Sequence, residues 1–229
     1  TIVTAPYLLE ELWQLCGRRL ADDVTLKQLD PFYQVRFDDG DTIDYSDDLD
    51  ALRAQIARIE PRDVPALDRF LAASQEIYDV AFGEFAAQPF HKFGTFLRAG
   101  PDLVRLGGFR SVHSFVCRYF RHPKLQVLFS FHPLLIGGNP FATTSFYCLI
   151  SHLERTFGVH WAMGGTGALI RGLADLVRGQ GGAVRCGAEV ATIDHDGRRA
   201  TGVTLASGEK LAADVVVISD SPMFDRGIP

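Results

Sequence analysis

Apolar residues recur at helical spacing in three stretches of the first half of the chain, and each stretch predicts an amphipathic helix. The stretches span residues 6–16, 49–59 and 67–85. Gly17 follows the first stretch as a stop signal, and Ser46-Asp47-Asp48 precedes the second as a source of capping oxygens. A largely helical first half is expected from this pattern.

The residues between the first two of these stretches follow a different pattern. Residues 33–37 alternate apolar and polar side chains, residues 38–40 read Asp-Asp-Gly, and residues 43–45 alternate back. Two alternating runs joined by a turn with glycine predict a β-hairpin.

In the last third of the chain, the spacing of apolar residues changes several times between the helical and the strand pattern, which is typical of an α/β arrangement. Gly164-Gly165-Thr166-Gly167 opens an amphipathic helix over residues 168–177. Short strands are expected at residues 183–185, 187–193, 203–205 and 210–211, with turns between the later ones at Asp196-Gly197 and Ser207-Gly208. Residues 215–218 are continuously apolar, as in a strand buried on both faces of a parallel sheet.

An almost uncharged run from Leu125 to Leu153 raises the question of a membrane span. A spanning helix needs about 20 unbroken apolar residues. Pro133 and the Gly137-Gly138-Asn139-Pro140 break divide the run into two shorter pieces. We therefore expect the run to be buried in protein, where it can line an apolar slot, and not to cross a bilayer.

Charge is unevenly distributed along the 229 residues, whose formal net charge is −5. The block from residue 90 to residue 124 holds nearly all of its charge as Lys and Arg, and these bases interleave with phenylalanines. Bases beside exposed aromatic rings suit an anionic bilayer surface, whereas a pair of ordinary packed helices would explain the same pattern without a partner. The acidic total argues against a nucleic-acid-binding protein.

The residues that usually carry catalysis form no familiar pattern. Four cysteines stand far apart without a C-x-x-C pair, which fits buried thiols in a reducing compartment: Cys16, Cys117, Cys148 and Cys186. The histidines show no metal-ligand spacing, so no metal site is expected, and no G-x-S-x-G motif is present. The glycine turn at residues 164–167 lacks both the G-x-G-x-x-G spacing and an expected preceding strand.

Several long stretches, taken together, resemble one family. The stretches are TIVTAPYLLEELW, IARIEPRDVPALDRFL, PFHKFGTFLRAGPDL and HPLLIGGNPFATTSFYCLISHLERTFGVHWAMGGTGALIRGLADLV. They occur in the same order as in the family of the bacterial phytoene desaturases, which are FAD-dependent carotenoid oxidoreductases. The likeness extends to about Ser219. It implies an α/β fold: a fragment of a flavin-binding Rossmann-like domain with a large inserted α+β substrate domain. Residues 1–160 would be the substrate and membrane-binding domain, and residues 161–229 part of the FAD-binding domain.

The resemblance also implies a chemistry and a site. Members of the family bind a C40 polyene at a membrane surface, from one side, and move a hydride from it to FAD. Glu189 and Val190 match the position that touches the adenine side of FAD, Ser219 lies near the cofactor, and Arg98 matches an arginine of the family's pattern. Arg98 is the candidate catalytic residue, and a lipid-phosphate or surface contact is its alternative role. Thr95 stands where relatives can carry an acid, which weakens any carboxylate role there.

The chain opens on Thr1 and the tail after residue 219 departs from the family, so we expect a fragment. Since the N-terminal dinucleotide motif and the C-terminal flavin segment are missing from it, weak or no FAD binding and no activity are expected of these residues alone. The family implies a bacterial cytoplasmic enzyme peripheral to the cytoplasmic membrane. Two alternatives stay open: a related flavin oxidoreductase acting on another isoprenoid, such as a retinol-saturase-like enzyme, and a non-catalytic lipid-binding fragment.

Overall fold

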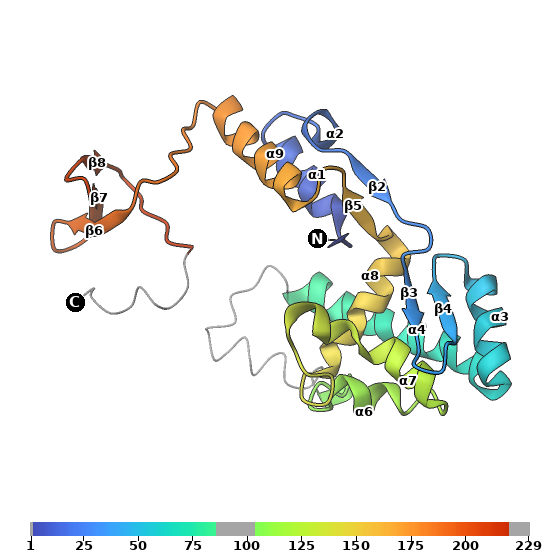
Figure 1. The fold of residues 1–229 in the computed structure, drawn as a ribbon. Coiled ribbons are helices and arrows are strands. Elements are labelled where there is room, and N and C mark those ends of the chain that lie inside the picture. The colour runs from blue at the N-terminus through green and yellow to red at the C-terminus, as the bar shows by residue number, and fades with distance from the viewer. Residues whose placement is uncertain (1, 86–103, 220–229) are drawn as a thin grey trace. The chain divides into compact units, whose positions relative to one another are not determined.

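The computed structural model describes residues 2–85 and 104–219. The chain divides into two compact units, Thr1–Leu176 and Val177–Pro229 (Figure 1). The sequence places its domain boundary earlier, at residue 160, and that assignment stays a prediction. The compact units divide later because the helix after the glycine turn packs on the first unit through Leu169, Leu173 and Leu176.

Helices dominate the first unit. They are α1 (Pro6–Leu15), α2 (Leu20–Asp23), α3 (Leu49–Ile59), α4 (Val64–Tyr78), α6 (Val112–Val116), α7 (Pro123–Ser130) and α8 (Leu149–Phe157). Short 3₁₀ turns are η1 (Pro61–Asp63), η3 (His132–Ile136) and η4 (Ser145–Cys148), and α4 runs on into a π-helix, η2 (Asp79–Phe85). α9 (Thr166–Gly179) crosses into the second unit. The three predicted helical stretches are therefore confirmed, although the third changes from α to π geometry at Asp79.

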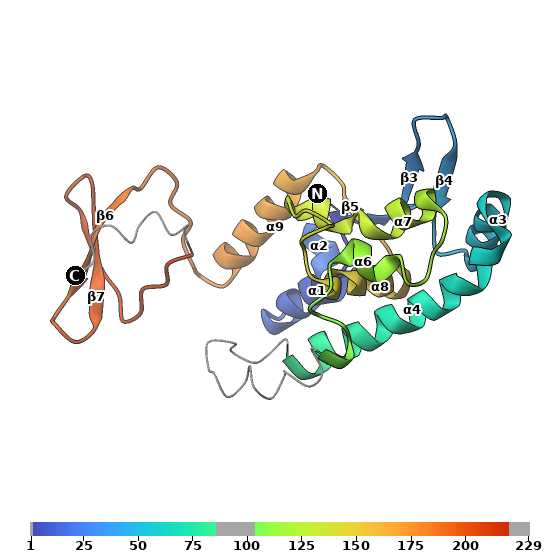
Figure 2. The same ribbon diagram turned by 90° about the horizontal axis from the view of Figure 1, so that it is seen from below.

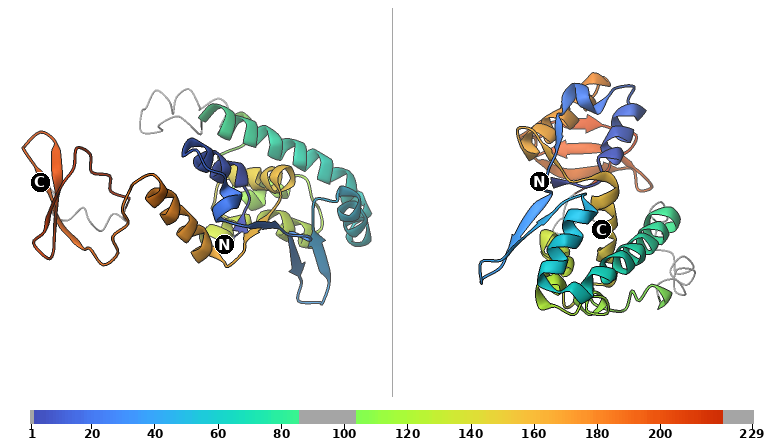
Figure 3. Two further views of the ribbon diagram at one scale, coloured as in Figure 1. Left: turned by 90° about the horizontal axis from the view of Figure 1, so that it is seen from above. Right: turned by 90° about the vertical axis from the view of Figure 1, so that its right-hand side faces the viewer.

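The predicted hairpin is confirmed as β3 (Tyr33–Arg36) and β4 (Thr42–Tyr45), which pair antiparallel with Tyr33 opposite Tyr45. It projects from the helices of the first unit (Figure 3). Asp48 begins α3 as expected, because its carboxylate accepts hydrogen bonds from the backbone N–H groups of Asp50 and Ala51.

The main core of the first unit forms where α3, α4, α7 and the hairpin meet. α4 packs along α8 and extends past α3 (Figure 2). The largest side chains here are almost fully buried, among them Leu52, Ile56, Leu67, Phe70 and Phe129. Stacking of Phe120 on Phe129, with ring centroids 4.4 Å apart, fixes the α6–α7 corner against α4. 

A smaller core joins α1, α2, α9 and a three-stranded sheet of order β1-β5-β2. Its strands are β1 (Ile2–Val3), β2 (Leu26–Gln28) and β5 (His160–Ala162), all antiparallel. The expectation that no strand precedes the glycine turn was wrong, because β5 ends just before it. Trp13 is fully buried here, whereas the predicted apolar stripe of α1 is exposed at Leu8, Leu12 and Leu15.

The second unit holds an antiparallel sheet of order β6-β7-β8. Its strands are β6 (Val190–His195), β7 (Ala200–Leu205) and β8 (Lys210–Ala212), with the expected turns between them. Two predicted strands were wrong. Residues 183–185 form no strand, and residues 215–218 are extended without a partner, with Val215 74% and Val217 85% exposed. An apolar run forms a buried parallel strand only when neighbouring strands pair with it, and the described residues supply none.

The architecture mixes helices and strands, which fits an α/β flavin-binding fragment in its coarse outline. All pairings among the described strands are antiparallel. Within residues 2–85 and 104–219, no helix combines the length and apolar character needed to cross a bilayer.

Candidate functional site

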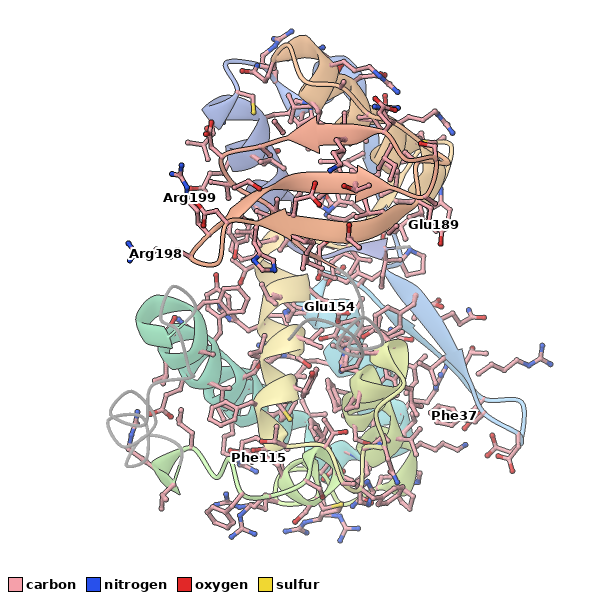
Figure 4. The ribbon with its side chains drawn as sticks, turned by 90° about the vertical axis from the view of Figure 1, so that its left-hand side faces the viewer. Phe37, Phe115, Glu154, Glu189, Arg198 and Arg199 are labelled. Carbon is pink, nitrogen blue, oxygen red and sulfur yellow. The ribbon has the colours of Figure 1, made fainter. Side chains whose placement is uncertain are left out.

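The predicted cofactor residues lie in the second unit. Glu189 is exposed immediately before β6, at the end of the sheet opposite the Arg198–Arg199 turn (Figure 4). Its carbonyl accepts a 2.8 Å hydrogen bond from the N–H of Ala206, and Val190 pairs with Leu205 while staying 37% exposed. Ser219 is exposed at the end of the described residues of this unit.

The segment before β6 is held in place by a bidentate ion pair. Arg185 Nη1 and Nη2 donate to Glu209 Oε1 and Oε2 at 2.9 and 2.8 Å, which ties the segment before Glu189 to the β7–β8 turn. An open hollow of about 630 Å³ lies on the same sheet and is lined by residues that include Asp194, His195 and Lys210. Glu189, Val190 and Ser219 do not line that hollow. Their assignment as cofactor residues stays a prediction.

The candidate catalytic residue, Arg98, lies outside the described residues, as does Thr95. The described chain leaves for this segment from η2 and returns at Val104, after which Arg105 pairs with Glu76 on α4. Both ends of the segment that carries Arg98 are thus attached near the C-terminal end of α4.

The uncharged run divides into a buried and an exposed part. Leu125, Leu128, Phe129, Cys148 and Leu153 are buried, mostly in the main core. These residues therefore fill space between helices, and the apolar slot expected from the run stays a prediction.

The exposed part of the run, together with Phe109 from the segment before it, forms a group that we term the apolar lip: Phe109, Leu134, Leu135, Ile136 and Phe141. Each is between 54% and 71% exposed. Backbone hydrogen bonds join the contributing segments, from Val112 N to Thr143 O at 2.8 Å and from Gly138 N to Pro133 O at 2.8 Å. The chain therefore exposes large apolar side chains from neighbouring segments here.

One base, Arg110, lies against a residue of the lip, and a second, Arg118, lies over a ring of the core. The Arg110 guanidinium lies 5.2 Å from the centroid of the Phe109 ring, and Arg118 lies 6.0 Å from that of Phe115. The expectation of an exposed basic-aromatic block was only partly right. Phe115 and Phe120 are buried at 3% and 0% exposure, because they face α4 and fill the core.

A buried polar cluster links the hairpin, η3 and α8. Glu154 Oε2 accepts from the Tyr33 hydroxyl and lies 3.1 Å from His132 Nε2, and the Glu154 side chain is fully buried (Figure 4). Burial, the nearby Tyr45 and the Glu154 carboxylate raise the pKa of Tyr33 well above its usual value, so its hydroxyl keeps the proton that it donates. Sequence analysis missed this cluster, whose three members come from separate elements.

Five half-buried rings form a second group, which we term the aromatic shelf: Tyr7, Tyr78, Phe82, His152 and Phe157. Tyr78 stacks on Phe82 with ring centroids 4.9 Å apart and lies at the same distance from His152, while Tyr7 lies 4.6 Å from Phe157. The hydroxyl oxygens of Tyr7 and Tyr78 are 3.4 Å apart. The rings come from α1, α4, η2 and α8, so helical periodicity alone could not have assembled them.

The cysteines are less buried than the sequence led us to expect. Cys117 and Cys186 are exposed, and Cys148 alone of the four belongs to the buried class. Burial raises the pKa of the Cys148 thiol to about 12. Among the described residues, no three His, Cys, Asp or Glu side chains gather as metal ligands would.

Comparison with known proteins gives a consistent result. The chain is 43% identical over 98% of its length to a lycopene-forming phytoene desaturase of Paracoccus sp., covering 45% of that protein. It is 41% identical over 95% of its length to a neurosporene-forming phytoene desaturase of Cereibacter sphaeroides, covering 42% of it. A lycopene-forming phytoene desaturase of Pantoea ananas is 39% identical over 94% of the chain, which covers 44% of that relative.

The chain thus spans somewhat less than half the length of the curated relatives that it matches. A family model described as flavin containing amine oxidoreductase matches residues 4–222, which include the whole described structure except its first two residues. The chain belongs to the family of flavin containing amine oxidoreductases.

Proposed function

We propose that the complete protein is an FAD-dependent carotenoid desaturase that acts on phytoene or a close relative, in carotenoid biosynthesis. The observation that carries the proposal is 39–43% identity to several bacterial phytoene desaturases over nearly the whole chain. More distant relatives support the broader alternative of another carotenoid substrate. They include a carotenoid 3,4-desaturase of Haloarcula japonica at 31% identity and an all-trans-zeta-carotene desaturase of Myxococcus xanthus at 30%.

The proposed arrangement is a Rossmann-like flavin domain with an inserted substrate domain. Residues 161–229 would contribute part of the former and residues 1–160 the latter. The division is supported by the separate antiparallel sheet of the second unit and by the helical main core of the first. Unpaired apolar residues at Val215 and Val217 are consistent with a strand that gains partners in a complete flavin domain.

Glu189, Val190 and Ser219 are the residues of this chain that we propose to contact FAD. The exposure of all three, and the ion pair that fixes the segment before Glu189, support the proposal of a rigid cofactor rim. When bound, FAD supplies the two-electron acceptor for hydride removal, so the protein needs neither a nucleophile nor a metal. The protein's task is to hold the hydrocarbon in position, exclude water and accept the proton that is released.

Arg98 is the proposed polar group for that task. A hydrocarbon that loses hydride and then a proton passes through positive charge, and an arginine can organise a proton-accepting neighbour or hold the substrate in place. In sequence, Arg98 stands between η2, which carries Phe82, and Arg105, which pairs with Glu76 on α4.

The apolar lip is the part of the chain that we propose to rest on a membrane, which makes the protein peripheral to the cytoplasmic membrane on its cytoplasmic side. Five exposed apolar side chains with Arg110 against Phe109, and the exposed base Arg118 in the turn after α6, match the needs of an anionic bilayer surface. A hydrocarbon substrate dissolved in the bilayer would then reach the protein without crossing water.

Product analysis tests the proposed reaction. The complete protein with FAD, added to vesicles that contain phytoene, should convert it to polyenes with longer conjugation, seen as new visible absorbance. Conversion of another carotenoid with phytoene left unchanged would favour the broader alternative. Flavin-loaded protein that alters none of these polyenes would refute the desaturase assignment.

A further inference from the structure

The aromatic shelf has the composition of a surface for a long unsaturated hydrocarbon. We propose that the shelf holds the polyene substrate, with the rings of Tyr78, Phe82 and Phe157 packing along its chain; this inference rests on the proposed desaturase function. The rings form a continuous series across four elements, and each remains half-exposed despite its contacts with the next. Aromatic side chains offer large apolar faces that a hydrocarbon can cover.

The polar atoms of the shelf have hydrogen-bond partners within the shelf or on the adjoining Thr156. The Tyr7 and Tyr78 hydroxyls are 3.4 Å apart, and Thr156 Oγ1 lies 3.2 Å from His152 Nε2. Covering polar groups with hydrocarbon costs free energy when they lose hydrogen bonds to water without replacement. Because these groups have such partners, an apolar ligand can cover the rings at a smaller cost.

The shelf is also uncharged near neutral pH. Burial, followed by the Tyr78 hydroxyl and then Glu11, raises the pKa of Tyr7 to about 12, so its phenol stays protonated. Burial lowers the pKa of His152, against an opposing effect of Asp79, so its imidazole is neutral. Glu11 and Asp79 are exposed and can remain in water beside a bound hydrocarbon.

The position of the shelf connects it with the proposed reaction. Tyr78 ends α4, Phe82 lies in the π-helix that follows, and the segment carrying Arg98 begins where that helix ends. The same segment returns next to Glu76, two residues before Tyr78, through the Arg105 ion pair. π-Helical turns occur often at functional sites.

The test compares one substitution at two sites. In the complete protein with FAD, Tyr78→Leu removes a shelf ring, and Tyr119→Leu removes a half-buried ring that packs on Phe70 and Phe115 outside the shelf. Steady-state turnover of phytoene in vesicles should show a KM raised at least about fivefold for Tyr78→Leu and unchanged for Tyr119→Leu. Tyr78→Phe, which keeps the ring, should behave like the unmodified protein.

A second readout does not depend on turnover. Lycopene, a coloured polyene, should quench the tryptophan fluorescence of the complete protein, and its apparent Kd should rise for Tyr78→Leu but not for Tyr119→Leu. Thermal unfolding at matched temperature separates lost binding from lost folding, and Phe82→Ala provides a second shelf variant if Tyr78→Leu proves unstable. Equal KM and equal lycopene affinity for shelf and control variants would overturn the inference. If the unmodified protein showed no turnover but its lycopene binding still depended on Tyr78, the desaturase assignment would be refuted. The inference that the shelf binds a polyene would still be supported.

Discussion

At the scale of single residues, Asp63 shows how one buried carboxylate can organise a corner of the fold. It is 1% exposed, and its Oδ2 accepts from the backbone N–H groups of Arg121 and His122 at 2.8 and 3.0 Å, where α7 begins. Asp63→Ala removes this acceptor and should reduce the free energy of unfolding by about 1–3 kcal/mol in urea titrations. Asp63→Asn keeps an acceptor oxygen and should cost less. Equal losses for both would show that the site requires the negative charge of the carboxylate, because asparagine matches aspartate in size and keeps an acceptor oxygen.

Val190 is the residue at which the cofactor proposal can be tested most locally. A backbone contact tolerates a change of side chain but not the loss of the N–H, so Val190→Ile should keep FAD and Val190→Pro should lose it. The flavin-to-protein ratio of the purified complete protein, from its absorbance spectrum, gives the measurement. Because proline can also disturb β6, Ala200→Pro at the start of the neighbouring strand β7 serves as a control. Equal flavin content in the two Val190 variants, or equal loss in the β7 control, would remove Val190 from the site.

At the scale of elements, Lys124 fastens the hairpin turn to α7. Its Nζ contacts the carboxylates of Asp39 and Asp41 and lies 5.4 Å from the centroid of the Phe37 ring. Hydrogen bonds to both carboxylates raise the pKa of Lys124, and the bond to Lys124 lowers that of Asp39. The stabilisation that Asp39 contributes is therefore present above the pKa of Asp39 in the unfolded chain, and it is lost as pH falls through the pKa of Asp39 in the folded protein. The stabilisation that Lys124 contributes is lost only as strongly alkaline pH is approached.

Lys124→Met should accordingly destabilise the protein most near neutral pH, and the difference from the unmodified protein should shrink in acid. Chemical unfolding at a series of pH values provides the measurement. Arg19→Met, which breaks an exposed pair with Asp22 within the α1–α2 corner, is a matched control and should have a smaller effect. A Lys124→Met difference that is independent of pH between neutral and acid would show that packing on Phe37, and not the charge pair, is the source of the effect.

The elements that could be predicted from the sequence are those whose signals are local. The hairpin has an alternating pattern and an Asp-Asp-Gly turn, and α3 has its capping Asp48, so both formed where expected. β1 and β5 are two and three residues long and pair across most of the first unit, too short to leave a periodic signal. The run at residues 215–218 carries a strand signal, yet a strand also needs partners that no local pattern can provide.

The candidate site likewise has parts that local sequence signals predict and parts that they do not. The exposed lip follows from an apolar run broken by Gly137 and Pro140, a local feature, although its exposure was not foreseen. The aromatic shelf and the Tyr33–His132–Glu154 cluster gather residues more than 70 positions apart, and only the packed helices bring them together. His132, one of two histidines in the uncharged run that precedes Glu154, was the one sequence hint of the buried cluster.

At the scale of the whole molecule, the lip predicts how the protein meets a membrane. In the complete protein, Leu135→Glu should weaken co-sedimentation with anionic vesicles at least about tenfold, because a charge replaces an apolar contact. Leu15→Glu, at a leucine of α1 that is 78% exposed, is the matched control and should leave binding unchanged. Added salt should weaken binding further through Arg110 and Arg118. Equal binding of both variants would show that the lip does not face the bilayer.

The central claim, hydride transfer from a polyene to flavin, is tested most directly by anaerobic reduction of the complete FAD-loaded protein with phytoene in vesicles. The flavin absorbance should fall as a more conjugated polyene appears in matching amount. Arg98→Ala should slow this step at least about tenfold, or some 1.4 kcal/mol in the barrier, with flavin content and vesicle binding unchanged. An unchanged reduction rate with weaker vesicle binding would make Arg98 a lipid contact. Flavin that stays oxidised in the unmodified protein with phytoene present would contradict the account.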